Sequence, residues 1–308
     1  MNGIANSHRR IGFVEVGPRD GLQNEARLVS TADKVELIRR AIDAGAQRIE
    51  VASFVNPKRV PQMADAEQVV ALLGQPQGVT RIGLVLNERG AERALLAGVD
   101  QLGAVAAASD PFGIRNQGQD SEQSIQVAER IVALATDAGR TAQVTIAVAF
   151  GCPFGGEVDP SHVVRMASRL AQSGAVEIAL ADTIGVAVPA QVTALVSAVK
   201  AAVGPLPVRV HFHDTRNTGI ANVWAAVEAG ASVVDASIGG LGGCPFAPGA
   251  AGNVASEDVA YLLSRSGVET GLDLDKLIAA AHWLSGVMDK PMPSMLSRAG
   301  GFPKPESE

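Results

Sequence analysis

The sequence has few of the features that mark secreted, membrane-spanning or nucleic-acid-binding proteins. Two cysteines among 308 residues are too few for a disulfide framework, so we expect a reducing, cytoplasmic location. No apolar run approaches the ~18–20 residues that a membrane helix needs. The N-terminal MNGIANSHRR has a basic pair but lacks the apolar core of a secretory signal. A net charge of −6 offers no basic surface for nucleic acid, so we expect neither a membrane nor a nucleic-acid partner.

Hydrophobic residues are abundant, at 47% of the chain against 19% charged residues, which predicts an ordered protein with a sizeable core. Short apolar runs alternate along the sequence with segments of helical, 3.6-residue periodicity. The predicted strands cover 12–16, 48–53, 81–86, 102–107, 143–149, 176–181, 208–212 and 233–237.

The predicted helices include 30–44, 119–138, 160–173, 189–202 and 218–228. The first has Ser30 or Thr31 as its N-cap and Gly45 as its C-terminal stop. A glycine follows several helical segments a few residues before the next strand, where a left-handed backbone lets the chain turn. These glycines are Gly45, Gly98, Gly139, Gly174 and Gly230.

Eight βα units with nearly continuous apolar strands indicate a parallel sheet covered by helices. A doubly wound sheet also suits this alternation, but eight repeats in about 250 residues favour a closed (β/α)8 TIM barrel. No proline-rich or low-complexity linker interrupts the series. We therefore predict one catalytic domain over residues 1–308, with the barrel at about 11–265. A helical C-terminal extension follows at about 266–308, with its helix at 273–288.

The residues that carry chemistry fall where the predicted strands end. In barrels of this kind, functional groups lie at the C-terminal ends of the strands and in the loops that follow them. The seventh, eighth, first and second strands are neighbours in a closed barrel, so groups on them come together. The candidates are Arg19 and Asp20 after the first strand, Glu50 and Ser53 on the second, Asp182 on the sixth, His211 and His213 on the seventh, and Cys244 and Asn253 after the eighth.

His211 and His213 are the clearest signal, because alternate residues of a strand point to the same face. Two imidazoles with one carboxylate form a site suited to Mg²⁺, Mn²⁺, Co²⁺ or Zn²⁺, with positions left open for substrate oxygens. Asp20 is the natural third ligand, although Asp-Gly is also a strong turn former. The alternative for either histidine is a core residue bonded to the backbone.

The remaining candidates each have two interpretations. Arg19 suits a developing enolate or thioester oxygen, or it neutralises nearby carboxylates. Cys244 is a proton donor or a small buried hydrophobe, and Asn253 is a turn residue or a metal ligand through its carbonyl oxygen. Burial makes Glu50 and Asp182 costly unless they are paired, so each forms a salt bridge to Arg19, orients a histidine or acts directly in catalysis.

Longer motifs make the chain resemble a known family. They are VEVGPRDGLQNE, IEVASFVNPKRVPQM, ADTIGVAVP, VHFHDT and GGLGGCPFAPGAAGNVASEDVAYLL. Over about residues 11–290 the sequence resembles the 3-hydroxy-3-methylglutaryl-CoA lyase family of metal-dependent barrel enzymes. The Arg-Asp-Gly and His-x-His motifs are shared with isopropylmalate, homocitrate and citramalate synthases. The glycine-rich loop with its cysteine is more specific to the lyases.

The resemblance implies a role for each matching residue. The divalent cation, Mg²⁺ or Mn²⁺, is expected on Asp20, His211, His213 and Asn253. Arg19, with Gln23 and Ser53, is expected to bind the acyl-CoA substrate, and Arg19 to stabilise the enolate as well. Cys244 is expected to be the active-site thiol, with Glu50 and Asp182 as supporting groups. Family analogy also implies a homo-oligomer, either a dimer or a tetramer.

The implied reaction is retro-Claisen cleavage of 3-hydroxy-3-methylglutaryl-CoA to acetoacetate and acetyl-CoA, with Asp20 or one of the histidines as base. Residues 216–219 read Arg-Asn-Thr-Gly where animal members carry Tyr-Gly-Gln, so a longer substrate such as the isohexenyl homologue is a rival. A Claisen-type synthase joining acetyl-CoA to a 2-oxo acid is a second alternative, but 308 residues leave no room for its usual further domain. A non-catalytic metal- or CoA-binding barrel is disfavoured, since the ligands, arginine and cysteine are all present.

Overall fold

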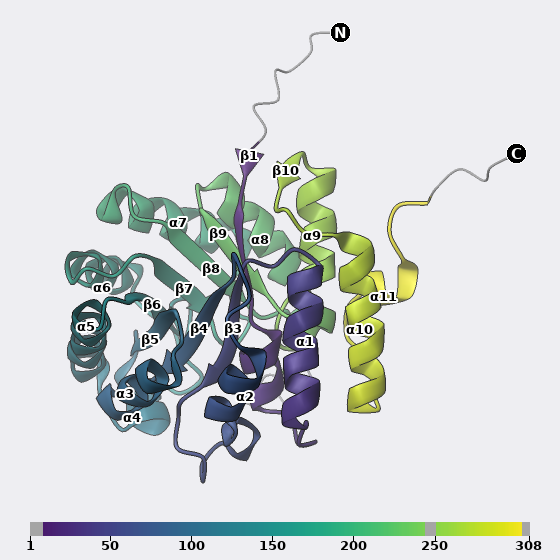
Figure 1. Ribbon diagram of the computed structural model, residues 1–308. Helices are drawn as coiled ribbons and strands as arrows, with labels where there is room; N and C mark the ends of the chain where they lie inside the picture. The colour runs from purple at the N-terminus through teal and green to yellow at the C-terminus, as the bar shows by residue number, and fades with distance from the viewer. Residues whose placement is uncertain (1–8, 244–250, 304–308) are drawn as a thin grey trace, which may run out of the picture.

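The protein folds as a closed parallel β-barrel surrounded by helices, as seen in the computed structural model (Figure 1). The structure describes residues 9–243 and 251–303. Each barrel strand pairs in parallel with the next, and the last pairs with the first. This confirms the predicted (β/α)8 TIM barrel. The strands are β2 (Gly12–Glu15), β3 (Arg48–Ser53), β4 (Thr80–Val85), β5 (Gln101–Ala107), β6 (Thr141–Ala147), β7 (Ile178–Asp182), β8 (Val208–Phe212) and β9 (Val233–Ala236).

The strands at 48–53 and 208–212 match the prediction, and the others differ by one or two residues at one or both ends. The pattern of apolar residues alone does not locate strand ends accurately, because buried apolar residues continue beyond the last hydrogen bond between neighbouring strands. In β6 the strand stops at Ala147 because Val148 turns to a positive φ of 51°. His213 lies one residue beyond β8, where it forms an isolated bridge with Asn253.

The helices cover the outside of the barrel (Figure 1). The Ser30 side chain accepts the N–H of Asp33, so Ser30 is the N-cap and Thr31 is the first helical residue. All five glycines expected to turn the chain have positive φ, from 66° to 99°. The helices are α1 (Thr31–Asp43), α2 (Ala66–Leu73), α3 (Glu88–Ala97), α4 (Asp110–Gln117), α5 (Ser121–Asp137), α6 (Pro160–Gln172), α7 (Pro189–Val203), α8 (Gly219–Glu228) and α9 (Ser256–Arg265).

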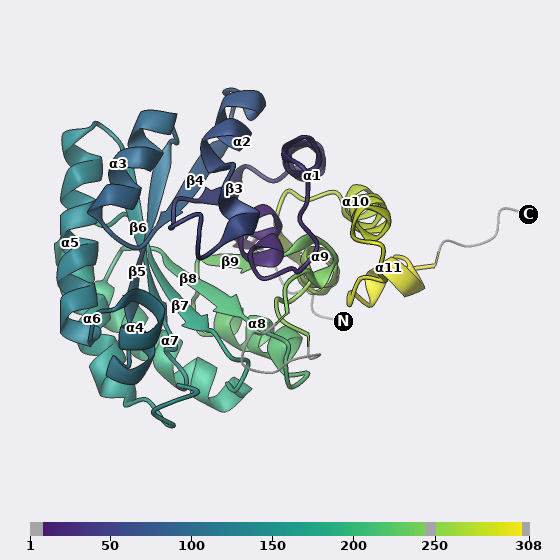
Figure 2. The same ribbon diagram turned by 90° about the horizontal axis from the view of Figure 1, so that it is seen from below.

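The C-terminal segment adds α10 (Leu274–Met288) and α11 (Leu296–Ala299) outside the ring of barrel helices. Figure 2 shows α10 packed beside α1 and α9, with α11 beyond it. At the other end of the chain, β1 (Arg9–Arg10) pairs in parallel with β10 (Val268–Glu269), a two-stranded sheet that the sequence pattern does not predict. Throughout the described ranges, every helix is too short or too polar to cross a membrane.

One buried carboxylate holds together three segments that shape the C-terminal face. Glu15 ends β2 and accepts hydrogen bonds from the N–H of Gly17 (2.7 Å), the N–H of Ile238 (3.0 Å) and the hydroxyl of Ser256 (2.6 Å). These partners begin the turn η1 (Gly17–Gly21), the turn η3 (Ile238–Gly240) and α9. A third turn, η2 (Pro61–Met63), lies before α2. Burial outweighs the hydrogen bonds and raises the pKa of Glu15 from 4.5 to about 8.

We expect Glu15 to make the fold less stable as the pH rises. Between pH 4.5 and about 8 the folded protein retains a proton that the unfolded chain has released, so the free energy of unfolding falls with pH. The contribution is at most ~1.4 kcal/mol per pH unit. Glu15→Gln mimics the protonated form and should flatten the dependence of urea-unfolding free energy on pH. Equal slopes in wild type and variant would contradict this, and Glu92→Gln, at an exposed residue, is the control.

Candidate metal centre and active site

A cavity of about 200 Å³ opens at the C-terminal face of the barrel. Its lining contains both polar and apolar residues. Most of the residues singled out from the sequence line it, including Arg19, Asp20, Gln23, Glu50, His211 and His213. The apolar lining residues are Val55, Leu84, Leu86, Val105, Phe112, Ala147 and Ala181.

The turn after β2 places Arg19 and Asp20 in this cavity. The N–H groups of Arg19, Asp20 and Gly21 all donate to the carbonyl of Val16, at 3.1, 2.7 and 3.2 Å. The chain therefore coils tightly at the strand end instead of leaving the barrel. Gly21 is required by close packing, because a Cβ there would lie 2.7 Å from the hydroxyl oxygen of Ser237.

Asp20, His211 and His213 form a cluster that fits a metal ion. Their ligand atoms all lie within 4.8 Å of one another. The two imidazole rings have centroids 5.0 Å apart and planes inclined at 58°. His211 Nδ1 donates to Asp235 Oδ1 at 2.7 Å, which holds the ring and leaves Nε2 free to bind a cation. The structure thus brings together the two histidines and the carboxylate that the sequence selects.

Asn253 lies beside this cluster. Its Nδ2 donates to Asp20 Oδ2 (2.9 Å) and to the carbonyl of Leu241 (3.1 Å). Its Oδ1 is buried and has no hydrogen-bond partner within the described residues, which is unusual for an amide oxygen. A cation bound beside Asp20 would satisfy this oxygen. Two imidazole nitrogens, a carboxylate and an amide oxygen fit a divalent cation of the Mg²⁺, Mn²⁺ or Zn²⁺ type.

The positive charge of Arg19 and the two histidines keep Asp20 ionised. Burial opposes ionisation of Asp20, but the positive charge of Arg19 and contacts with the two histidines outweigh it and hold its pKa well below the usual value. On the other side, Arg19 Nε donates to Glu50 Oε2 at 2.7 Å. Glu50 is buried and forms the salt bridge to Arg19 that was one of its two expected supporting roles.

The hydrogen bonds of Asp182 are to the backbone, and its expected part in catalysis stays a prediction. Its carboxylate neither pairs with Arg19 nor bonds a histidine; it accepts the backbone N–H groups of Val186 and Ala187, both at 2.9 Å. Its neighbours Ala181 and Thr183 line the cavity. Because side chains alternate along a strand, Asp182 points away from the cavity and holds the loop after β7.

The remaining candidates from the sequence are Ser53, Gln23 and Cys244. Ser53 is fully buried and donates to Gln23 Oε1 at 3.0 Å, so it supports Gln23, whose side chain lines the cavity. Substrate binding by this pair stays a prediction. Cys244 lies outside the described residues. Cys152 is buried, and its sulfur accepts the N–H groups of Phe154 (3.4 Å) and Gly155 (3.2 Å), which agrees with a structural role.

Two residues of the site escaped the sequence analysis, Arg209 and Asp235. Arg209 is fully buried on β8 and lies 3.4 Å from Glu50, 3.4 Å from Asp235 and 3.6 Å from Glu177. A signal for both was present in the sequence. Arg209 stands two positions before His211, on the same face of the strand, and Asp235 is the acidic residue in the apolar strand VVDA.

The fold and the cluster define a TIM barrel whose C-terminal face carries a group of side chains able to hold a metal ion. A family model described as HMGL-like matches residues 10–284. The chain therefore belongs to the HMGL-like family.

Three relatives illustrate the range of this family. The chain is 44% identical to (R)-citramalyl-CoA lyase of Chloroflexus aurantiacus, over 94% of this chain and 95% of the relative. It is 42% identical to 3-hydroxy-3-isohexenylglutaryl-CoA/hydroxymethylglutaryl-CoA lyase of Pseudomonas aeruginosa, over 96% and 98% of the two chains. A solved HMG-CoA lyase of Acinetobacter baumannii, in complex with coenzyme A and 3-methylmalate, superposes with a TM-score of 0.91 at 37% identity, covering 98% of this chain and 100% of the other.

We expect the four donors to bind Mn²⁺ together. Asp20→Ala or His213→Ala should abolish binding measured by calorimetry, and Asn253→Ala should weaken it by about tenfold or more. Asn222→Ala is the matched control, because Asn222 is also a buried amide but bonds the carbonyl of Ala187 instead of a cavity group. Affinity that stays at the wild-type value in Asn253→Ala would remove this residue from the ligand set.

Proposed function

We propose that the protein is a divalent-metal-dependent carbon–carbon lyase that cleaves a 3-hydroxyacyl-CoA ester. The observation that carries the proposal is the Asp20, His211 and His213 cluster with the Arg19 guanidinium beside it in one cavity. Membership of the HMGL-like family, and the CoA-ester lyases to which the chain is similar, support the same reaction class.

The reaction breaks the bond between C2 and C3 of the ester. A base, either Asp20 or one of the histidines, takes the proton of the C3 hydroxyl as C3 becomes a carbonyl. The bonding electrons pass to the thioester, which leaves as an enolate, and a proton donated to C2 completes acetyl-CoA. A divalent cation on the four donors, Mg²⁺ or Mn²⁺, would acidify the hydroxyl when bound.

Arg19 is positioned to stabilise the enolate. Its Nε and terminal nitrogens hold Glu50 and Asp20, which orients the guanidinium and leaves the other N–H of each terminal nitrogen for a substrate oxygen. A permanently charged donor that is already aligned costs little reorganisation when negative charge develops. We assign the final protonation of C2 to the Cys244 thiol, on the resemblance alone.

We propose 3-hydroxy-3-methylglutaryl-CoA as the substrate and citramalyl-CoA as the second candidate. Both carry a methyl group and a carboxyl-bearing branch on the hydroxylated carbon, and relatives named for each are about equally similar to this chain. The cavity of about 200 Å³ is small for a ligand pocket, which supports a short acyl group over the isohexenyl homologue. Arg216, in the segment that departs from the animal sequences, donates to the carbonyls of Ile184 and Gly185, and the described cavity lining does not include it.

The first experiment is a coupled assay with (S)-3-hydroxy-3-methylglutaryl-CoA and Mn²⁺ or Mg²⁺, following acetoacetate and acetyl-CoA. We expect both products in equal amounts and loss of turnover with EDTA, because the donor set is built for a cation. Citramalyl-CoA and the isohexenyl homologue are assayed in parallel. Release of pyruvate from citramalyl-CoA without any acetoacetate from the first substrate would reassign the acyl group. Cleavage of none of them by folded, metal-loaded protein would refute the lyase.

Arg19→Gln should lower kcat by about 100-fold or more, because it removes the donor that faces the developing enolate. Circular dichroism must show that the variant is folded, since Glu50 loses its partner. Arg39→Ala, at an exposed position on α1, is the control for loss of a surface charge. A variant with wild-type kcat and a raised KM would assign Arg19 to ground-state binding only.

A further inference from the structure

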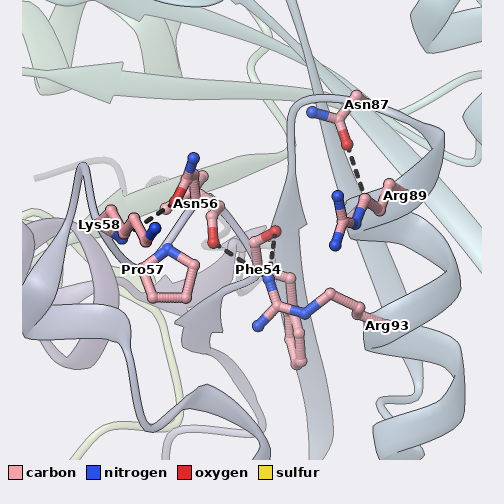
Figure 3. Close-up of a pocket in the computed structure, with 9 residues that line it drawn as sticks. Phe54, Asn56, Pro57, Lys58, Asn87, Arg89 and Arg93 are labelled. Carbon is pink, nitrogen blue, oxygen red and sulfur yellow. Dashed lines mark hydrogen bonds between the residues drawn. The ribbon is translucent and has the colours of Figure 1, made fainter.

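Arg209, on β8, has partners of a different kind from those of an arginine that holds a loop. Arg93 is an arginine of the loop-holding kind: its Nη1 donates to the carbonyls of Phe54 (3.3 Å) and Val55 (3.1 Å), which ties α3 to the loop after β3 (Figure 3). Among the described residues, the hydrogen-bond and ion-pair partners of Arg209 are all side chains. The role of Arg209 therefore depends on what those side chains hold.

Two carboxylates each divide their oxygens between Arg209 and a group of the active site. Glu50 Oε1 lies 3.4 Å from Arg209 Nη2, and Glu50 Oε2 accepts the Nε–H of Arg19 at 2.7 Å. Asp235 Oδ2 lies 3.4 Å from Arg209 Nε, and Asp235 Oδ1 accepts the Nδ1–H of His211 at 2.7 Å. We call the contacts from Arg209 through Glu50 to Arg19 the arginine arm, and those through Asp235 to His211 the histidine arm.

The inner groups of both arms have little room to move. The side chains of Arg209, Glu50 and Asp235 are each 2% exposed. Thr145 Oγ1 accepts the Nη2–H of Arg209 at 3.1 Å, and Glu177 Oε1 lies 3.6 Å from Arg209 Nε. Charges buried this deeply are stabilised by their neighbours and not by water. The position of one guanidinium therefore determines the orientation of both carboxylates.

We propose that Arg209 is a positioning residue that aligns two parts of the active site at once, the guanidinium of Arg19 and the imidazole of His211. The inference rests on the proposed function, since that function assigns the enolate to Arg19 and the metal to His211. Each carboxylate bonds its active-site partner with one oxygen and is held by Arg209 at the other, so it cannot rotate out of line. Such support is what keeps catalytic groups and metal ligands in productive geometry.

The alternative is a purely structural role, in which Arg209 only neutralises the buried acids around it. Lysine distinguishes the two roles, because Arg209→Lys keeps the positive charge and supplies a compact ammonium in place of a planar guanidinium. An ammonium neutralises the acids but cannot contact both Glu50 and Asp235 in the way that Nη2 and Nε do. A structural role therefore predicts that Arg209→Lys behaves as wild type, and a positioning role predicts that it does not.

Arg48 offers the matched control. It also lies in the barrel interior, where its Nη1 and Nη2 donate to Glu177 at 2.7 and 3.0 Å. Its hydrogen bonds and ion pairs with the described residues go to Glu177 and Gln101, and so bypass both arms. Arg48→Lys and Arg48→Met therefore disturb the same group of buried charges without touching Glu50 or Asp235.

The exchange of two side-chain protons with water measures the arms directly, in protein without metal or substrate. With ¹⁵N-labelled histidine and arginine, the Nδ1–H of His211 reports on the histidine arm and the Nε–H of Arg19 on the arginine arm. In Arg209→Met both protons should exchange about tenfold faster than in wild type or more, and in Arg209→Lys at least one of them should. Both Arg48 variants should keep the wild-type rates.

Two outcomes of the exchange measurement would overturn the proposal. Wild-type rates for both protons in folded Arg209→Lys would show that charge alone is enough. Faster exchange of only one proton in Arg209→Met would show that Arg209 supports one arm and not two. Circular dichroism establishes that each variant is folded, and if Arg209→Met does not fold, Arg209→Lys decides by itself.

Mn²⁺ binding and turnover test the same arms in the assembled enzyme. The Kd for Mn²⁺ depends on His211, and kcat at saturating Mn²⁺ depends on the alignment of Arg19. In Arg209→Met we expect the Kd to rise and kcat at saturating Mn²⁺ to fall, each by about tenfold. KM should change little, because the alignment of Arg19 matters most when the enolate charge develops. Arg48→Met should match wild type in all three quantities.

The two experiments separate this inference from the lyase assignment. If no ester is cleaved but proton exchange accelerates in Arg209→Lys, the proposed reaction fails and the positioning role stands. If an ester is cleaved and folded Arg209→Lys keeps the wild-type exchange rates and kcat, the positioning role fails and the reaction stands.

Discussion

The active site depends on charge compensation inside the barrel. Arg209 is buried among Glu50, Asp235 and Glu177, and Glu50 also binds Arg19, which in turn contacts Asp20. Positive and negative groups therefore alternate from the barrel interior to the cavity. The inner groups, Arg209 and its three acidic neighbours, are too deep to be solvated by water, so loss of one of them leaves a buried charge unpaired. The same chain of contacts orients His211 through Asp235 and keeps the guanidinium of Arg19 aligned.

The closed parallel barrel brings these paired charges to one face, where they line a cavity. All strands end at one face, so η1 after β2, the histidines at β8 and Asn253 beyond β9 surround one space. Glu15, buried at the end of β2, holds the segments after β2 and β9 together through its hydrogen bonds to Gly17 and Ile238. Because β3 and β4 are neighbours, the loops that follow them lie next to each other at the same face. One geometric rule, the convergence of parallel strand ends, thus places the candidate site residues around one cavity.

The features of the fold and the site that depend on residues close together in the chain could be predicted from the sequence. Strand and helix periods predict the barrel, and the two-residue spacing of His211 and His213 predicts that they share a face. The salt bridge from Glu50 to Arg19 follows from the need of a buried acid for a partner. The same reasoning did not predict the backbone partners of Asp182, because it cannot tell a side chain facing the cavity from one facing the loop behind it. That choice depends on the exact strand register, which also decides the position of His213 just beyond β8.

The sequence by itself determined the alternation of strands and helices, the chemical types of the site residues and the strand ends that carry them, because these depend on neighbours within a few positions. Tertiary structure alone decided that the side-chain nitrogen of Asn253 holds Asp20, 233 positions away, while its oxygen has no partner among the described residues. It also decided that Asp235 fixes the ring of His211. These features are distances and orientations between segments far apart in the chain, and only the packing of the closed barrel sets them.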